Sequence, residues 1–414
     1  MSSQALQTPE KSAWLLPVAM VGASMFGITS AFSLSSWLNW SVIGVSILGF
    51  CAAIEIVRGR IDFGDGYDVI LTAVGMLLAV AISMALSNVS VDEKAWNHFF
   101  ARNFTIVFLF LLPSILLRSN ALLVFAVKKG LVLTAWLSIF LILYDFLRLN
   151  GYLDLGAVPH LFAGEELDAT HRVDIYRARG GSIEPGHDAS VIAAILPLMV
   201  DRIREKFRLA FICLIAAIVY FMGYSTSLVL WLLVFSLVYS VLLSGVSLHG
   251  KVLAVARVFG MAVFLFFAFD YFGIIEDLET KIFSSSYEDR IGSFIDIASG
   301  VAENGGALLF GYGPGGYLAS GVSMVTNTFS GWVLDSGLLG LFFYLCAILL
   351  CWRRLLLCSD PLYMAAFIAY LSVFVMAIGN YWFPTHWLFL LYPIFSLSNR
   401  EREIKSDSTG RQFV

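Results

Sequence analysis

The strongest constraint on this chain is a series of apolar runs that recur from one end to the other. About 20 apolar residues in a helix cross a bilayer, and a helix satisfies its backbone hydrogen bonds within the segment. Of the 414 residues, 59% are hydrophobic and 14% are charged, whereas roughly a quarter of the residues of a soluble domain are charged. We therefore predict an all-α polytopic membrane protein.

The apolar runs indicate about twelve transmembrane helices, two of which are short. They are expected near 13–34, 37–57, 69–88, 97–117, 125–147, 187–200, 209–224, 226–247, 252–274, 331–352, 361–380 and 385–398.

The lysines and arginines predict how these helices are oriented. Cytoplasmic loops of membrane proteins carry an excess of both residues. With the amino terminus in the cytoplasm, most of the 26 basic residues fall on the cytoplasmic side, and both termini are expected there. Two long loops then face outwards, at about 148–186 and 275–330. The whole of 1–414 is expected to be a single integral membrane domain.

The composition argues against several kinds of function. The net charge of −4 and the lack of basic runs do not suggest binding to nucleic acid. The five cysteines lie in apolar runs or beside Arg353 and Arg354, so no disulfide framework is predicted in the two long loops. No metal site and no cofactor are predicted.

Three arginines gather in the first outer loop, shortly before the span at 187–200. Arg172, Arg177 and Arg179 precede two adjacent glycines, which let a backbone approach a ligand closely. A guanidinium group can bind phosphate through two parallel hydrogen bonds. We predict that the three arginines hold a diphosphate, with the acidic residues of the same loop as their alternative partners.

Glu184 and His187 flank Pro185 at the start of the next span and are acid–base candidates. A carboxylate at an apolar boundary can titrate near neutral pH. The alternative for Glu184 is a first-turn acid that interacts with the helix dipole, since proline favours the first turn of a helix. The alternative for His187 is a structural role.

The second outer loop contains aromatic and glycine residues that suit a sugar. Tyr312 and Tyr317 lie within GYGPGGY, which lacks the lysine and the preceding strand of a phosphate-binding P-loop. Tyr287 and Arg290 begin a segment with helical spacing. The later run NYWFPTHW, at 380–387, is expected to form an interfacial aromatic belt, with sugar stacking as the alternative.

Four further polar residues are expected near the outer ends of spans. Asn327 and Asp335 lie at the start of the span 331–352, where a buried carboxylate requires a partner or a function. His98 and Arg102 are four residues apart and therefore share one face of a helix. Arg102 is expected to point into the same cavity as His98 or to reach lipid headgroups.

These motifs resemble those of the O-antigen polymerase and ligase superfamily. RARGGSIEP, at 177–185, is similar to the arginine, glycine and Glu-Pro element that precedes a span in that family. GYGPGGY, at 311–317, and TNTFSGWVLDSGLLGL, at 326–341, resemble its second-loop motif, in which a glycine turn precedes an asparagine and a Gly-Leu-x-Gly step. Arg290 matches an arginine upstream of that turn. The layout of about twelve spans with two large outer loops also matches.

The resemblance implies a glycosyltransferase of the GT-C type at the periplasmic face of the bacterial inner membrane. It implies a polymerase that joins oligosaccharide repeat units on undecaprenyl diphosphate into O-antigen, capsule or exopolysaccharide, inverting the anomeric carbon without a metal. The implied partners are lipid-linked glycans, membrane lipids and a chain-length regulator.

The residues and the resemblance together give an expected site. The catalytic residues are expected to be Glu184, Arg177 and Arg290. The substrate-binding residues are expected to be Arg172, Arg179, His187, Arg102, Tyr287, Tyr312, Tyr317, Asn327 and Asp335.

Two alternative functions remain open. A ligase of the same superfamily moves finished glycan to a lipid A core or to a protein. The histidine that such ligases carry before the second-loop asparagine is replaced here by Thr326, which favours a polymerase. A transporter or flippase of lipid-linked glycans commonly shows internal repeats, and none is apparent in this sequence.

Overall fold

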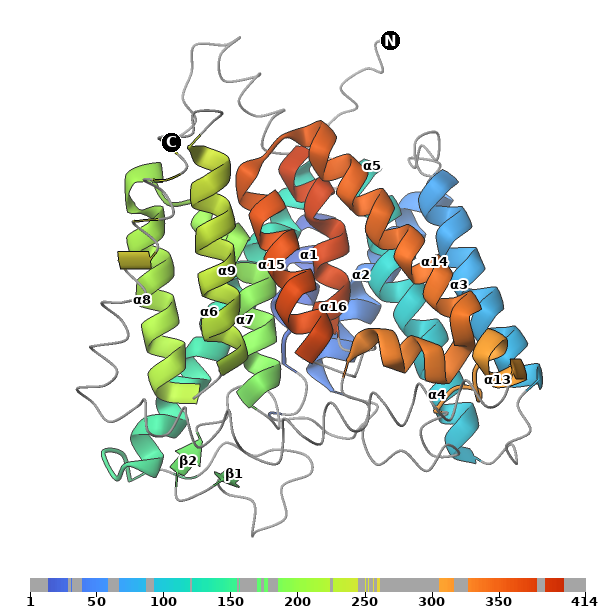
Figure 1. The fold of residues 1–414 in the computed structure, drawn as a ribbon, viewed down its shortest axis with the longest axis horizontal. Coiled ribbons are helices and arrows are strands. Elements are labelled where there is room, and N and C mark those ends of the chain that lie inside the picture. The colour runs from blue at the N-terminus through green and yellow to red at the C-terminus, as the bar shows by residue number, and fades with distance from the viewer. Residues whose placement is uncertain are drawn as a thin grey trace.

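A computed structural model of the chain shows a bundle of helices (Figure 1). It describes residues 14–28, 39–58, 67–86, 93–119, 121–154, 170–172, 175–177, 185–223, 226–244, 305–315, 327–377 and 384–397, together with a few single positions. In chain order the elements are α1 (Leu15–Ser24), α2 (Trp40–Val57), α3 (Tyr67–Leu86), α4 (Glu93–Thr105), the π-helix η2 (Ile106–Leu111), α5 (Leu112–Ser119), α6 (Ala121–Leu149), β1 (Thr170–Arg172), β2 (Ile175–Arg177), α7 (Pro185–Val200), α8 (Glu205–Gly223), α9 (Thr226–Leu243), α13 (Gly305–Phe310), α14 (Thr328–Cys358), α15 (Pro361–Ala377), α16 (Pro384–Leu388) and the 3-10 helix η5 (Phe389–Leu391).

Several of these helices fit a membrane protein. Five are long and apolar enough to cross a bilayer, namely Trp40–Val57, Tyr67–Leu86, Ala95–Leu117, Leu122–Leu149 and Thr328–Cys358. The predicted helical class therefore holds for the bundle. A short antiparallel hairpin of β1 and β2 in the first long loop was not predicted. The predicted span at 252–274 lies outside the described residues apart from single positions.

The central helix of the bundle is α7. It contacts α6, α8, α9, α15 and α16, and every residue from Asp188 to Val200 is buried. Protein therefore surrounds this part of the helix. The helix begins at Pro185, which confirms the predicted first-turn proline.

Helix α1 is shorter than predicted, since it ends at Ser24 rather than near residue 34. The Thr134 hydroxyl of α6 donates a hydrogen bond of 2.5 Å to the Ser24 carbonyl. The Gly27 amide donates to the same hydroxyl at 3.4 Å. A side chain from a neighbouring helix thus satisfies backbone groups that a longer α1 would have satisfied itself.

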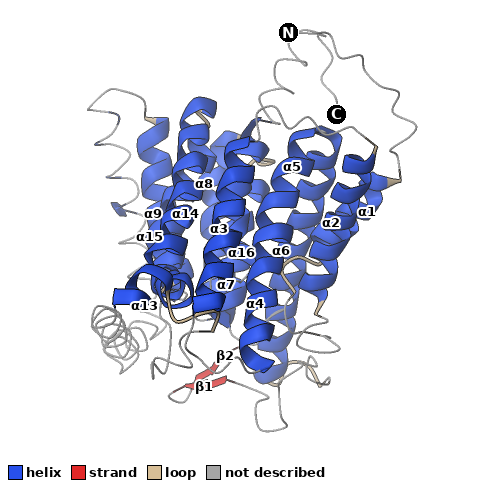
Figure 2. Ribbon diagram, turned by 90° about the vertical axis from the view of Figure 1, so that its right-hand side faces the viewer, coloured by secondary structure: helices blue, strands red, loops and turns tan. Residues whose placement is uncertain are grey.

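The two ends of the bundle differ in their elements and ion pairs. The β1–β2 hairpin, α13 and the beginning of α4 lie at one end, which we call the hairpin end (Figures 1 and 2). At the opposite end, Arg354 of α14 pairs with Asp68 of α3, with Nη2 2.6 Å from Oδ2. There too, Lys128 of α6 lies 3.1 Å from Asp201, just after α7.

Candidate functional site

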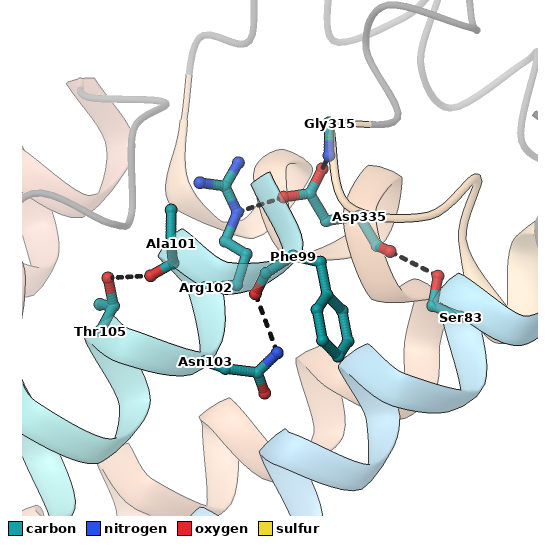
Figure 3. Close-up of polar contacts among 8 residues, drawn as sticks. All are labelled: Ser83, Phe99, Ala101, Arg102, Asn103, Thr105, Gly315 and Asp335. Atoms are coloured by element: carbon teal, nitrogen blue, oxygen red, sulfur yellow. Dashed lines mark hydrogen bonds and ion pairs between the residues drawn. The ribbon is translucent and has the colours of Figure 1, made fainter. Parts of the chain in front are cut away.

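Asp335 of α14 lies at the centre of a group of polar contacts at the hairpin end (Figure 3). The Asp335 side chain is 4% exposed and that of Arg102 of α4 is 1% exposed. Arg102 Nε donates a hydrogen bond of 2.6 Å to Asp335 Oδ2. A buried ion requires a partner, because its desolvation costs several kcal/mol. The sequence predicts that Asp335 needs a partner or a function, and Arg102 is a partner.

The glycine turn, residues 311–315, is attached to the same carboxylate. The Gly315 amide donates to Asp335 Oδ1 at 3.0 Å. The Tyr312 amide donates to the Leu334 carbonyl at 2.8 Å. The turn that the sequence predicts as a sugar-binding element is therefore anchored on α14 through two backbone amides.

The glycines of this turn are explained by its backbone. Gly311, Gly313 and Gly315 have φ values of 75°, 98° and 81°, in the left-handed region that favours glycine. A Cβ on Gly311 would lie 2.6 Å from the Ser336 amide nitrogen, and one on Gly315 would lie 2.7 Å from His98 Cδ2. Both positions therefore exclude larger residues.

Helix α14 is interrupted at Gly337, where φ is 64° and ψ is −166°. A Cβ at this position would lie 2.3 Å from the Leu309 carbonyl oxygen, so α13 packs where only glycine leaves room. Buried carbonyl groups next to such a break need hydrogen-bond donors. The Asp335 carbonyl accepts one from the Ser83 hydroxyl of α3 at 2.6 Å. The Leu334 carbonyl is satisfied by the glycine turn.

His98 lies one helical turn before Arg102 and contacts the same glycine turn. The Cδ2 and Cγ atoms of its imidazole lie nearest the position that a Cβ on Gly315 would occupy. The sequence places His98 and Arg102 on one face of a helix. The structure shows that this face meets the glycine turn and Asp335.

This arrangement can fix a loop in place. Both carboxylate oxygens accept hydrogen bonds, one from Arg102 and one from Gly315. The ion pair carries no net charge. We interpret Asp335 and Arg102 as an anchor that holds the glycine turn on α4 and α14.

Asn327 caps the amino terminus of α14. Its side-chain oxygen accepts a hydrogen bond of 2.8 Å from the Ser330 amide, and the residue is 6% exposed. Asparagine is favoured at this position, where it contributes about 1 kcal/mol to helix stability. The predicted contact of Asn327 with a substrate stays a prediction beside this structural role.

The β1–β2 hairpin contains two of the predicted diphosphate-binding arginines. Thr170 pairs with Arg177 and Arg172 pairs with Ile175, so the two arginines stand at opposite ends of the paired strands. The hairpin lies at the same end of the bundle as the glycine turn (Figures 1 and 2). Outside the described structure lie the side chains of these two arginines and the residues Arg179, Glu184, Tyr287, Arg290 and Tyr317.

His187 lies in the first turn of α7, also at the hairpin end. The Ser190 hydroxyl donates to the His187 carbonyl at 2.7 Å, and the Ser190 and Thr385 hydroxyl oxygens are 3.0 Å apart. The contact between Ser190 and Thr385 joins α7 to α16. The role of the His187 side chain stays a prediction, and so does its structural alternative.

The interpretation of residues 380–387 as an interfacial aromatic belt is wrong for their described half. Thr385, His386 and Trp387 are each 1% exposed. Trp387 packs against Trp332 and Tyr344 of α14, with ring centroids 6.4 Å and 6.1 Å away. The aromatic ring therefore faces protein rather than the membrane interface.

Two polar residues of the bundle were missed by the sequence analysis. His386 is buried, and neither ring nitrogen has a hydrogen-bond partner among the described residues. A histidine within an apolar run is a feature that could have identified it. Ser83 is a small polar residue in an apolar helix, and the sequence contains nothing that connects it to Asp335.

No protein-family model matches the chain, and no curated protein matches it either. Among the described residues, no group of three or more His, Cys, Asp and Glu side chains could hold a metal ion.

Proposed function

We propose that this protein is an integral-membrane glycosyltransferase that polymerises lipid-linked oligosaccharide repeat units. One observation carries the proposal: the arginine-bearing hairpin and the anchored glycine turn lie at the same end of the bundle (Figures 1 and 2). A substrate with a diphosphate next to sugars requires cationic and sugar-binding groups on one side of the membrane. Two loops far apart in the sequence can supply both groups there.

In this proposal the chain has about twelve spans in a GT-C arrangement within the bacterial inner membrane. Both termini lie in the cytoplasm, and the hairpin end faces the periplasm. The ion pairs of Lys128 and Arg354 at the opposite end support this orientation, because basic residues concentrate on the cytoplasmic side.

The reaction transfers a growing glycan from undecaprenyl diphosphate to a lipid-linked repeat unit. A hydroxyl of the acceptor sugar attacks the anomeric carbon from the face opposite the diphosphate, so the configuration inverts. Undecaprenyl diphosphate leaves with the bonding electron pair. Arginine guanidinium groups stabilise the negative charge that develops on it, and we assign this role to Arg177, Arg179 and Arg290, with Arg172 beside them.

The remaining assignments concern the sugars. Tyr312 and Tyr317 belong to the glycine-rich segment and are assigned to sugar contacts. The anchor formed by Asp335 and Arg102 supports this assignment, because it fixes the described part of that segment at the hairpin end. Glu184 stays the sequence-based candidate for activating the acceptor.

Arginine substitutions test this function. Arg177→Ala and Arg290→Ala are expected to abolish chain extension, because each removes a guanidinium from the diphosphate, while membrane insertion stays normal. Arg177→Lys is also expected to lose most activity, since an ammonium group cannot bind bidentately. The readout is the ladder of lipid-linked glycans on a gel, with membrane content measured by immunoblot.

Arg148→Ala is the matched control for these variants. Arg148 lies at the end of α6 and pairs with Asp145 at 3.0 Å, and the proposal does not assign it to the diphosphate. Its ladder is expected to be normal. Normal ladders from Arg177→Ala and Arg290→Ala as well would refute the diphosphate-binding role.

A further inference from the structure

An exposed aromatic cluster lies in the first turns of the apolar span Ala95–Leu117, at the hairpin end of the bundle (Figures 1 and 2). The Trp96 and Phe100 rings stack on each other, with centroids 5.9 Å apart and planes 28° apart. Phe99 meets both rings edge to face, at 5.7 Å from each, and packs against the core. Trp96 is 45% exposed and Phe100 is 61% exposed. The cluster is therefore supported by the protein on one side, and its outer side is exposed.

Exposed tryptophans and tyrosines are concentrated at the ends of helices. Among the described residues, the exposed side chains of these two types are Trp14, Tyr67, Trp96, Trp136 and Tyr152. All of them except Trp136, in the middle of α6, lie within three residues of a helix end. Exposed phenylalanines and leucines also occur in the middle of helices, for example Phe50, Leu78 and Phe342. Tryptophan and tyrosine combine an apolar ring with a polar group, and they gather where the hydrocarbon core of a bilayer meets the headgroups.

We propose that the cluster of Trp96, Phe99 and Phe100 binds the headgroup region of the bilayer and marks the membrane boundary at the hairpin end. The span that begins at Ala95 has 23 residues, so as a helix it is about 34 Å long. This length crosses a hydrocarbon core of about 30 Å, and the first turns of the span then lie at the level of the headgroups. The aromatic belt that the sequence predicts at residues 380–387 is assigned to this cluster instead.

This boundary determines the depth of the anchor formed by Asp335 and Arg102. Arg102 follows Trp96 by six residues, which corresponds to about 9 Å along a helix. The headgroup region is roughly 5–8 Å thick on each side of the hydrocarbon core. The anchor therefore lies where the headgroup region meets this core. A diphosphate on a membrane lipid belongs to the headgroup region directly above that level, and this last consequence alone rests on the proposed function.

The test measures how deeply Trp96 lies in the bilayer, using the full-length protein without substrate. The protein is reconstituted into phosphatidylcholine vesicles whose lipids carry bromine either close to the headgroup or close to the end of the acyl chain. Bromine quenches tryptophan emission on contact. Subtracting the emission of Trp96→Phe from that of the wild type isolates the contribution of Trp96 among the ten tryptophans. We expect the shallow bromine to quench this contribution more strongly than the deep bromine.

Trp136→Phe is the matched control, because Trp136 has the same exposed fraction of 45% but lies in the middle of α6. Its contribution is expected to show the opposite order. Quenching of Trp96 that is strongest with the deep bromine would overturn the inference. So would a Trp96 contribution that neither brominated lipid quenches, whether water-soluble acrylamide reaches it or a second copy of the chain covers it. An inactive protein with a shallow Trp96 would contradict the proposed function alone.

Discussion

Asp335 and Arg102 are expected to affect the stability of the fold as a pair rather than independently. Asp335→Asn is expected to lower the free energy of unfolding by about 3–5 kcal/mol, because it removes the charged partner of the buried Arg102 guanidinium. The double variant with Arg102→Met is expected to cost less than the sum of the two single variants. Thermal unfolding of the four proteins in detergent measures this coupling, and additive losses would contradict it.

Asp360 lies in the turn between α14 and α15, where Oδ1 accepts a hydrogen bond of 3.0 Å from the Leu362 amide. Burial raises the pKa of the Asp360 carboxyl above its ordinary value of 3.8. A carboxyl with a raised pKa in the folded state binds protons more tightly when folded. Its contribution to stability is therefore present below pH 3.8 and is lost as the pH rises through the folded-state pKa.

Asp360→Asn is accordingly expected to be at least as stable as the wild type at neutral pH. The difference in free energy of unfolding between the variant and the wild type is expected to shrink as the pH falls. The asparagine oxygen can keep the hydrogen bond to the Leu362 amide. Asp360→Ala loses this cap and is expected to be about 1 kcal/mol less stable. Melting temperatures from pH 4 to 7.5 provide the check. A wild-type advantage over Asp360→Asn that grows with pH would count against the raised pKa.

At the scale of elements, the break in α14 determines where α13 and the glycine turn lie. Gly337→Ala is expected to destabilise this unit by at least about 1–3 kcal/mol, the approximate cost of a backbone conformation that is essentially restricted to glycine, with a further cost from the clash with Leu309. Hydrogen exchange of residues 305–315 should accelerate. In Gly305→Ala, the control, the added Cβ meets nothing within 4 Å. Equal protection in both variants would contradict the role of the break.

The long helices could be predicted from the sequence because their apolar runs satisfy the length requirement of a bilayer on their own. Features that depend on a neighbouring helix could not be predicted from the sequence. The end of α1 requires Thr134 of α6, and the break at Gly337 accommodates Leu309 of α13. The three-residue strands of the hairpin are too short for alternation to indicate them.

At the scale of the whole molecule, the sequence indicates that Asp335 needs a partner or a function but does not indicate how the residues around it are arranged. A carboxylate in an apolar span indicates that a partner exists. That partner is Arg102, 233 positions away in the chain, and no local pattern connects the two. The same holds for His98 and Gly315, which only the packing of α4 against the turn brings together.

The proposed activity also makes a claim about the whole molecule: it requires no sealed membrane. A transporter acts only across a membrane, whereas a polymerase is active in detergent. A ligase needs a second kind of acceptor, so repeat units alone would give it no product.

The most direct measurement is therefore incubation of the purified protein in detergent with a single species of lipid-linked repeat unit. The products are then separated by size. We expect a ladder of longer lipid-linked glycans that Arg177→Ala fails to produce. Folded wild-type protein that leaves only single repeat units would contradict the proposal that this protein is a polymerase.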